Sequence, residues 1–441
     1  MQLILLSCII SSALSFFRKV EDGDPFRCPR TPLWLSLHET VTRAYDFMEI
    51  GYFEQARTLL VVVSEHALAD VSIAFECSIG ISALHRALSY SYTTDPSKLS
   101  SPGSSRRASQ IGLRMMHVAM NWLTHAFVKK ANNRGEWVDR SSWPISIQAI
   151  NDEETTIQQA IIATGAYGSK PVRSDIPPDF RDRKLRIGIV SVCDYPGGNP
   201  LPRLSRSNRQ LYADKHGYTV IEEFRRFDES RPHAWAKITL LLAHIMSKEF
   251  DWLLWFDCDT YFMNFDITLD SILYRYGADQ SGDGLNPKFK MLIQEDHAML
   301  NTGVFFIKTG VWAQALLQRV YGPPTSPWID HPWWENAAFS HEFLGNLAQR
   351  MLDGNISESD MDGIYPDGVL VSPQELFNSY HPITSRIFMH DTWEAGKFVL
   401  AFSGCKSGSS EAVVHELYEN YYRIMCELNN VQSLCVQIQE A

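Results

Sequence analysis

The sequence predicts an α/β fold with a mostly parallel central sheet, preceded by an all-helical N-terminal region. Three observations among its 441 residues support this prediction. From about residue 35 to 163, the apolar residues recur at helical spacing, with few strand signals. After residue 184, short apolar runs alternate with segments of helical length, which is typical of strands joined by helical crossovers. Between the two parts, the polar stretch 174–178 contains two prolines and indicates a linker.

The N-terminal end resembles a targeting segment. Residues 1–17 are mostly apolar and are followed by Arg18 and Lys19. The run is short for a membrane span, which needs roughly 20 residues, and it fits the apolar part of a signal peptide, although no basic residue precedes it. We therefore expect a signal peptide or a short signal anchor. Either would send the chain into the secretory pathway, to the lumen of the Golgi or endoplasmic reticulum.

Residues 30–170 are expected to form the helical region. In the stretch 44–60, Gly51 separates two helical patterns, so the sequence predicts a helix, a turn and a second helix. The motif resembles half of a tetratricopeptide hairpin, but it does not recur at a fixed period, so a solenoid is not supported. The Ser/Pro/Gly cluster 100–105 predicts a loop between helices. We regard this region as a candidate surface for a protein partner.

The second part, residues 184–425, begins with a strand and then alternates. The expected elements, in order, are a buried strand over 185–192, a helix over 206–216, a strand over 218–221, a helix over 234–248 and a strand over 251–256. In parallel sheets with helical crossovers, ligands bind beyond the carboxyl ends of the strands. The site is therefore expected where the strand over 251–256 ends.

Charge and cysteine content exclude some classes of partner and site. The formal net charge of -11 gives the protein no overall attraction for nucleic acid or anionic lipid. None of the eight cysteines forms a C-x-x-C pair, so a zinc site has no support. In a secretory protein some could pair as disulfides, but the sequence leaves their connectivity open. One N-glycosylation sequon stands at 355–357, in a polar stretch.

Two carboxylates follow the strand over 251–256, in Asp257-Cys258-Asp259. Extended residues two apart point the same way, so both carboxylates could face one cation while Cys258 points to the core. A divalent cation there would act as a Lewis acid on a diphosphate leaving group. Two other Asp-x-Asp sequences, at 22–24 and 360–362, have no strand before them, and we ascribe them to chance.

Six sequence blocks between about 185 and 425 resemble, in order, those of glycosyltransferase family 34. They are Ser207–Tyr212 with His216-Gly217, Ala234–Lys237, Asp251–Thr260, Asn301–Phe306, Phe377–Tyr380 and Gly404–Lys406. The family includes fungal α-galactosyl- and α-mannosyltransferases and plant xyloglucan xylosyltransferases. The resemblance implies a GT-A fold, a UDP- or GDP-linked sugar donor, Mn²⁺ as cofactor, and transfer with retention of anomeric configuration.

The resemblance also implies roles for single residues. Asp257 is expected to contact the nucleotide or the metal, and Asp259 to bind the metal. Further contacts with the nucleotide-sugar are expected from four residues in the matched blocks and from a lysine placed to meet the diphosphate: Asn208, Lys237, Asn301, Gly303 and Lys406.

The catalytic group is expected at Glu335 and Asn336, which fall where the family has an acidic residue followed by Gln. A retaining transfer needs a group on the β-face of the sugar that stabilises or attacks the oxocarbenium-like state. The resemblance implies this role for Glu335, with Asn336 beside it. The alternative is a glutamate that only stabilises a helix N-terminus. Asp296 is a second candidate carboxylate.

One position departs from the family. Its third protein ligand to the metal is a histidine, and Ala401 stands there. Either His381 or His390 substitutes, or metal affinity is reduced, or catalysis is impaired. Asp257, Asp259, the diphosphate and water would still suit a hard cation.

Three functions therefore compete. The first is a retaining glycosyltransferase that moves a hexose or pentose to a glycan or glycoprotein acceptor. An aromatic-rich segment containing Tyr321, Pro323, Pro324, Trp328, Trp333 and Trp334 is a candidate acceptor surface. The second is a non-catalytic binding or scaffold protein of the same fold. A nucleotide-sugar hydrolase or nucleotidyltransferase is less favoured, because the loop 193–202 has glycines but no lysine.

Overall fold

The computed structural model describes residues 32–68, 77–131, 185–225, 228–281, 284–296, 300–353, 364–382, 392–405 and 410–435. The chain divides into two compact units. One comprises Met1–Tyr167 and Phe343–Ile364, and the other comprises Gly168–Glu342 and Tyr365–Ala441. Several predicted features lie outside the described residues: the segment 1–17, the linker 174–178, the sequon 355–357, and the Asp-x-Asp sequences at 22–24 and 360–362.

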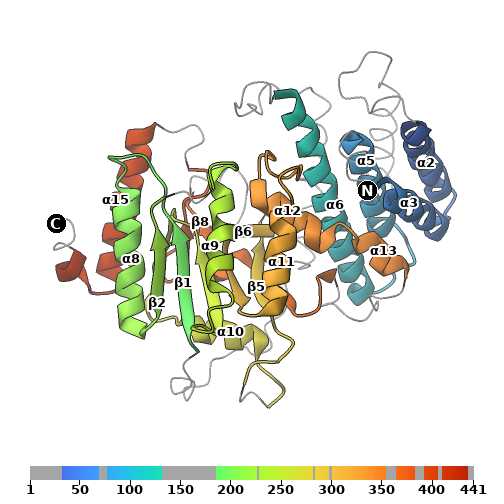
Figure 1. The fold of residues 1–441 in the computed structure, drawn as a ribbon. Helices are drawn as coiled ribbons and strands as arrows, with labels where there is room; N and C mark the ends of the chain where they lie inside the picture. The colour runs from blue at the N-terminus through green and yellow to red at the C-terminus, as the bar shows by residue number, and fades with distance from the viewer. Residues whose placement is uncertain are drawn as a thin grey trace. The chain divides into compact units, whose positions relative to one another are not determined.

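In the first unit, the regular elements of the described residues are all helices (Figure 1). They are α2 (Pro32–Glu49), α3 (Phe53–Leu68), α5 (Ser78–Thr93), α6 (Pro102–Ala131) and α13 (Leu347–Leu352). The predicted helix pair around Gly51 is confirmed, because this glycine ends α2 with φ 85° and its N–H donates to Met48 O at 3.1 Å. Helix α13 packs against α3 although some 280 residues of chain separate them.

The predicted loop at 100–105 is shorter than expected. Helix α6 already begins at Pro102, a residue whose fixed φ suits the first helical position. Ser101 supplies the cap, since its Oγ accepts a hydrogen bond from the Ser104 N–H at 3.2 Å. In the described part of the chain, no helix combines the length and the hydropathy that a membrane crossing needs.

The second unit is built on a six-stranded sheet in the order β2-β1-β3-β6-β5-β7. Its strands are β1 (Ile187–Val192), β2 (Thr219–Glu223), β3 (Trp252–Phe256), β5 (Met291–Glu295), β6 (Leu300–Lys308) and β7 (Val369–Ser372). Every pairing is parallel except those of β6, which runs antiparallel to both of its neighbours. The predicted fold class, a mostly parallel α/β sheet preceded by a helical region, is confirmed.

A smaller sheet and the remaining helices complete this unit. The small sheet has the order β4-β9-β8, with β4 (Thr260–Phe262), β8 (Ser379–Tyr380) and β9 (Val399–Ala401). The helices are α8 (Leu201–His216), η3 (His233–Trp235), α9 (Ala236–His244), α10 (Leu269–Gly277), α11 (Val311–Tyr321), α12 (Trp334–Leu344), η5 (Gln374–Leu376) and α15 (Glu411–Leu428). The helix predicted over 234–248 thus ends at His244, and Lys248 takes a left-handed conformation with φ 60°.

The main sheet is covered on both faces, as its continuous apolar strands require. Trp252, Leu254 and Phe256 of β3 join Tyr212 of α8 and Tyr418 of α15 in one buried cluster. The residues between them point to the opposite face, where α9 packs against β3 and α11 packs against α9 (Figure 1). The end of β3 therefore emerges from a rigid, buried support.

Candidate active site

Asp257 lies where β3 ends and is oriented by its neighbours. Its N–H donates to Gly303 O on β6 at 2.9 Å, so the strand pairing continues to this residue. Its Oδ1 accepts a hydrogen bond from the indole N–H of Trp255 at 2.6 Å and lies 3.3 Å from Lys237 Nζ. The side chain is 31% exposed, so the carboxylate is held in place and still reaches solvent.

The chain does not stay extended through Asp259, as the sequence argument assumed. Residues 258 and 259 form a turn between β3 and β4, and the Thr260 hydroxyl closes it by donating to Asp257 O. The two carboxylates nevertheless act on one neighbour. Burial raises the pKa of Tyr195 well above its usual value, and the charges of Asp259 and Asp257 raise it further. Both carboxylates therefore contribute negative charge to the surroundings of Tyr195.

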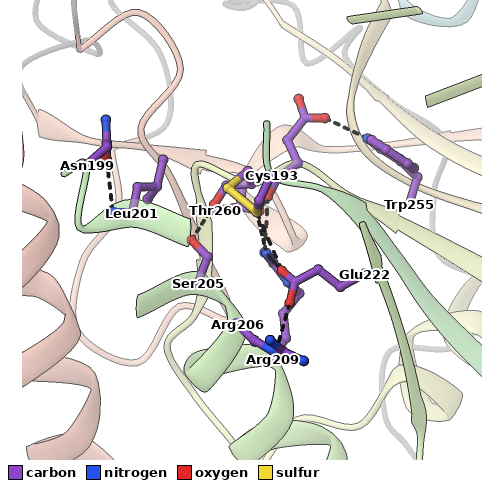
Figure 2. The surroundings of a disulfide bond; sticks show 11 residues. Cys193, Asn199, Leu201, Ser205, Arg206, Arg209, Glu222, Trp255 and Thr260 are labelled. Atoms are coloured by element: carbon purple, nitrogen blue, oxygen red, sulfur yellow. Dashed lines mark hydrogen bonds and ion pairs between the residues drawn. A yellow bond between two sulfur atoms is a disulfide. The ribbon is translucent and has the colours of Figure 1, made fainter. Parts of the chain in front are cut away.

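A disulfide bond anchors this turn on its buried side. Cys258 is buried, as predicted, and pairs with Cys193, 65 residues earlier at the end of β1. Figure 2 shows Ser205 and Arg209 of α8 beside the bond. Ser205 Oγ donates to Cys258 O at 2.5 Å. Arg209, fully buried, donates to Cys193 Sγ at 2.9 Å and forms an ion pair with Glu222 of β2. Two strands and a helix therefore position the turn.

Asn208 is placed on the same helix but faces the backbone of β4. Its Nδ2 donates to Phe262 O at 2.9 Å, and its Oδ1 accepts from the Phe262 N–H at 2.8 Å. The residue is completely buried. In the structure, both ends of this amide are used to hold β4 against α8.

Lys237 joins the carboxylate of Asp257 to that of Glu335. Its Nζ is 2.7 Å from Glu335 Oε1 and donates to Thr302 O at 2.7 Å. Burial alone would lower the pKa of Lys237, but the charges of Asp257 and Glu335 outweigh it and raise that pKa. The two carboxylates therefore favour the charged form of this buried ammonium group.

Glu335 lies in the first turn of α12 and is almost fully buried. Thr302 donates its hydroxyl to Glu335 Oε1 at 3.1 Å, but Glu335 Oε2 is buried with no hydrogen-bond partner among the described residues. Burial raises the pKa of this carboxyl above its usual value, against the opposing effect of Lys237. The Asn336 side chain binds the backbone of β6, since its Oδ1 accepts a hydrogen bond from the Thr302 N–H at 2.7 Å. The structure thus brings Lys237, Glu335 and Asn336 together around Thr302.

A second polar cluster, made up of Asp296, Asn301 and Tyr380, is joined to Gly303 through Asn301. Asn301 donates through Nδ2 to Asp296 Oδ2 at 3.0 Å and to the Tyr380 hydroxyl at 2.7 Å, and Tyr380 itself donates to Asp296 at 2.6 Å. Asn301 Oδ1 accepts from the Gly303 N–H at 2.7 Å. Asp296, a second candidate carboxylate from sequence, is therefore tied to Asn301 and Tyr380.

Ala401 lies opposite Thr260 in the pairing of β9 with β4, and the next residue, Phe402, donates its N–H to Asp259 O at 2.8 Å. Position 401 therefore adjoins the Asp-x-Asp turn, and its side chain is fully buried. His381 donates its N–H to Ala401 O at 2.9 Å, and its ring lies against Phe402. Burial lowers the pKa of His381 to about 4, which favours neutral imidazole. His390 and Lys406 lie outside the described residues.

Part of the candidate acceptor segment is core. The Arg231 guanidinium lies 3.6 Å from the ring centre of Tyr321, and Trp328 is buried against the His341 ring at 4.9 Å. Trp333 and Trp334 are only half-buried. Tyr321 is likewise half-buried, and Pro323 and Pro324 are exposed, so Trp328 is the buried member of the segment, and Trp333 and Trp334 are the partly exposed members next to Glu335 in the sequence.

The sequence reasoning missed several residues that shape the site: Tyr195, Arg209, Trp255, Asn378 and Tyr380. Trp255 could have been found, because it stands two residues before Asp257 on a strand and so shares its face. Arg209, Asn378 and Tyr380 lie in the matched blocks Ser207–Tyr212 and Phe377–Tyr380, so the resemblance could have pointed to them. Tyr195 lies outside these blocks and was not signalled.

Comparison with known proteins gives consistent matches. The family model described as the galactosyl transferase GMA12/MNN10 family matches residues 190–412. A protein named as a probable alpha-1,6-mannosyltransferase, MNN10 of Saccharomyces cerevisiae, is 25% identical over 177 residues, which cover 33% of this chain and 44% of that protein. An uncharacterized alpha-1,2-galactosyltransferase of Schizosaccharomyces pombe is 28% identical over 145 residues, covering 26% and 38%. The chain thus spans less than half the length of these relatives.

Among solved structures, a glycosyltransferase involved in the glycosylation of the major capsid of PBCV-1 aligns over 53% of this chain and 98% of its own, with 18% identity and a TM-score of 0.36.

Proposed function

Because this chain belongs to the galactosyl transferase GMA12/MNN10 family, we propose that it is a retaining glycosyltransferase that moves a hexose or pentose from a nucleotide-sugar to a glycan or glycoprotein acceptor. Its resemblance to glycosyltransferase family 34, seen in six sequence blocks, is confirmed by the family match. The strongest support for this proposal is a set of buried contacts. A buried lysine, Lys237, links the strand-end Asp257 to a buried glutamate, Glu335, which keeps one oxygen without a partner among the described residues.

The residues at the end of β3 fit a hard divalent cation. Asp257 and Asp259 supply carboxylate oxygens, which Mn²⁺ accepts, and the Asp257 side chain is 31% exposed, so it can reach a bound ion. Among the residues that the structure describes, no cluster of three or more metal-ligating side chains occurs, so we propose that the donor diphosphate and water complete the coordination. When bound, Mn²⁺ would act as a Lewis acid on the diphosphate, and Lys406 would add a positive charge there.

Glu335 is the proposed group on the β-face of the sugar. Its unpartnered Oε2 can stabilise positive charge that develops at the anomeric carbon. Lys237 holds Oε1, and Asn336 holds the Thr302 backbone beside it. The carboxylate is therefore fixed before the donor arrives, and reorganisation during transfer costs little. The predicted donor contacts of Lys237, Asn301 and Gly303 are part of this proposal.

Asn208 and the Cys193–Cys258 disulfide have positioning roles in this proposal. Asn208 uses both ends of its amide on the Phe262 backbone, so it would influence the donor through the position of β4. The disulfide ties the Asp-x-Asp turn to β1. Both restrain the metal-binding carboxylates from the side away from solvent.

We also propose a lumenal location in the secretory pathway, the Golgi or endoplasmic reticulum. Two disulfides among the described residues, Cys193–Cys258 and Cys426–Cys435, support an oxidising compartment. The half-buried Trp333 and Trp334 are the proposed acceptor surface, since aromatic faces commonly line sugar-binding grooves. The N-terminal helices are a proposed surface for a protein partner.

The proposal is tested by binding and turnover. UDP-galactose, UDP-xylose, GDP-mannose, UDP and GDP are screened by thermal shift with and without Mn²⁺, and nucleotide release is measured. We expect Mn²⁺-dependent stabilisation and slow hydrolysis of one donor, both abolished by Asp259→Asn. Asp266→Asn is the matched control, because the Asp266 side chain is 89% exposed and pairs with Lys215 at the surface. Unchanged Mn²⁺-dependent binding in Asp259→Asn would refute the site.

The buried Ala401 favours one alternative, a non-catalytic binding protein that has lost a metal ligand. Stabilisation by a nucleotide or a glycan without any Mn²⁺ effect, together with no turnover of the three donors, would support this alternative over the enzyme.

A further inference from the structure

Asn378 is a buried amide with no visible structural task for its side chain. The residue is 1% exposed, and neither Oδ1 nor Nδ2 has a hydrogen-bond partner among the described residues. Its backbone is well fixed, because its N–H donates to Gln374 O at 3.0 Å and its carbonyl accepts from Gln374 Nε2 at 3.2 Å. A buried amide without partners destabilises a protein. The unsatisfied Asn378 amide therefore lowers the stability of the fold, and packing alone does not explain its presence.

The amide lies beside a glycine at which the chain is closely packed. A Cβ added to Gly303 would lie 2.9 Å from Asn301 Oδ1, 3.2 Å from Asp257 Oδ2 and 3.7 Å from Asn378 Nδ2. Gly303 is not among the glycines with positive φ, so its backbone does not require glycine. The absence of a side chain instead lets Asp257, Asn301 and Asn378 lie close together around Gly303 at the end of β3.

The chemistry of this cluster suits a sugar hydroxyl group better than a bare anion. Asp257 places a carboxylate beside the Asn378 amide, and this negative charge would repel an anion that no metal ion bridges. The Asn378 amide can accept through Oδ1 and donate through Nδ2, and neither atom has a partner among the described residues. Hydroxyl groups of a sugar ring can donate to the one and accept from the other at once.

We infer that Asn378 binds hydroxyl groups of the transferred sugar and helps to determine which sugar the enzyme accepts. This inference rests on the proposed function, since it takes the ligand to be a nucleotide-sugar. It assigns Asn378 to the sugar half of the donor, whereas the diphosphate belongs to Asp257, Asp259 and Lys406.

The test removes the polar atoms and keeps the shape, with Asn378→Leu. Dissociation constants are measured by calorimetry for the preferred nucleotide-sugar among UDP-galactose, UDP-xylose and GDP-mannose, and for the matching nucleoside diphosphate. We expect roughly 10- to 100-fold weaker binding of the nucleotide-sugar, as for a lost hydrogen-bond pair in a buried site, and unchanged binding of the diphosphate. The melting temperature should stay the same or rise, because two unsatisfied atoms are removed.

Asn208→Leu is the matched control. Asn208 is an equally buried asparagine, but both ends of its amide are bonded to Phe262, so its loss should lower the melting temperature. If Asn378→Leu does not fold, Asn378→Asp carries the test, since it keeps the size and replaces the donor with a carboxylate oxygen. It should weaken nucleotide-sugar binding in the same selective way.

The outcomes separate this inference from the proposed function. If the wild type binds a nucleotide-sugar and both Asn378 variants bind it equally well, the inference is overturned and the proposed function stands. Equal weakening of nucleotide-sugar and diphosphate, or a large fall in melting temperature, would show a structural role for Asn378. If the wild type binds no nucleotide-sugar and no diphosphate, both proposals fail.

Discussion

Replacing Lys237 with methionine should destabilise the fold, because it leaves the buried Glu335 carboxylate without its counter-ion. The substitution keeps an apolar stem of similar length and removes the ammonium group that lies 2.7 Å from Glu335 Oε1 and 3.3 Å from Asp257 Oδ1. The Glu335 side chain is only 2% exposed, so its charge would lose its counter-ion in a place where water cannot replace it.

The size of the expected loss of stability follows from the burial of Glu335. Breaking a buried ion pair by removing one partner costs about 3–5 kcal/mol, because the remaining charge stays desolvated. For a unit of this size, 1 kcal/mol corresponds to a change in melting temperature of roughly 2–4 °C. Lys237→Met should therefore lower the melting temperature by about 6–20 °C. Glycosyl transfer should fall with it, because the Glu335 carboxylate is no longer held.

The loss of stability in Lys237→Met should depend on pH. The pKa of Glu335 is raised above its usual value mainly by burial, so between the unfolded-state and the folded-state pKa the folded protein binds more protons than the unfolded chain. Stability from this group is present at low pH and declines as the pH rises through the folded-state pKa. Without Lys237 the pKa rises further. The deficit of Lys237→Met relative to wild type should therefore be small near pH 4 and grow toward pH 7.

Calorimetric unfolding of four proteins measures these effects: wild type, Lys237→Met, Glu335→Gln and the double variant. Glu335→Gln in the Lys237→Met background should restore most of the lost stability without restoring transfer, since the uncompensated charge is gone. Strictly additive effects of the two changes, or an unchanged melting temperature in Lys237→Met at pH 7, would refute the buried ion pair.

Two further substitutions test the neighbouring geometry. Ala401→His should tighten Mn²⁺ binding at least roughly 10- to 100-fold, which is the effect of losing only a partner that orients a ligand, because position 401 pairs with Thr260 beside Asp259; no gain in a Mn²⁺ titration would mean that the third ligand comes from elsewhere. Gly303→Ala should cost about 1–3 kcal/mol in folding stability, as overpacking does, and weaken nucleotide-sugar binding, because the new Cβ would stand 2.9 Å from Asn301 Oδ1; unaltered affinity by calorimetry would show that donor binding does not depend on the packing around Gly303.

The local periodicity of the chain was sufficient to predict the elements that carry the site. The five-residue apolar stretch before Asp257 is a fully buried strand, and Gly51 ends one helix before the next begins. Both signals are local, because side-chain spacing and backbone freedom act within a few residues. Element ends were less well predicted. The Asp-x-Asp segment forms a turn, since the Thr260 hydroxyl bonds back to Asp257.

The sequence by itself determined the α/β class, the Asp257–Asp259 pair and its place after a buried strand, and the resemblance that names Glu335 and Lys237. Only the tertiary structure decided that Lys237, Asp257 and Glu335 meet, that Cys193 pairs with Cys258, and that Asn378 lies beside Gly303 with its amide unpartnered. These contacts join segments tens of residues apart. Their partners are selected by how the buried faces of strands and helices pack, and no spacing along the chain records that choice.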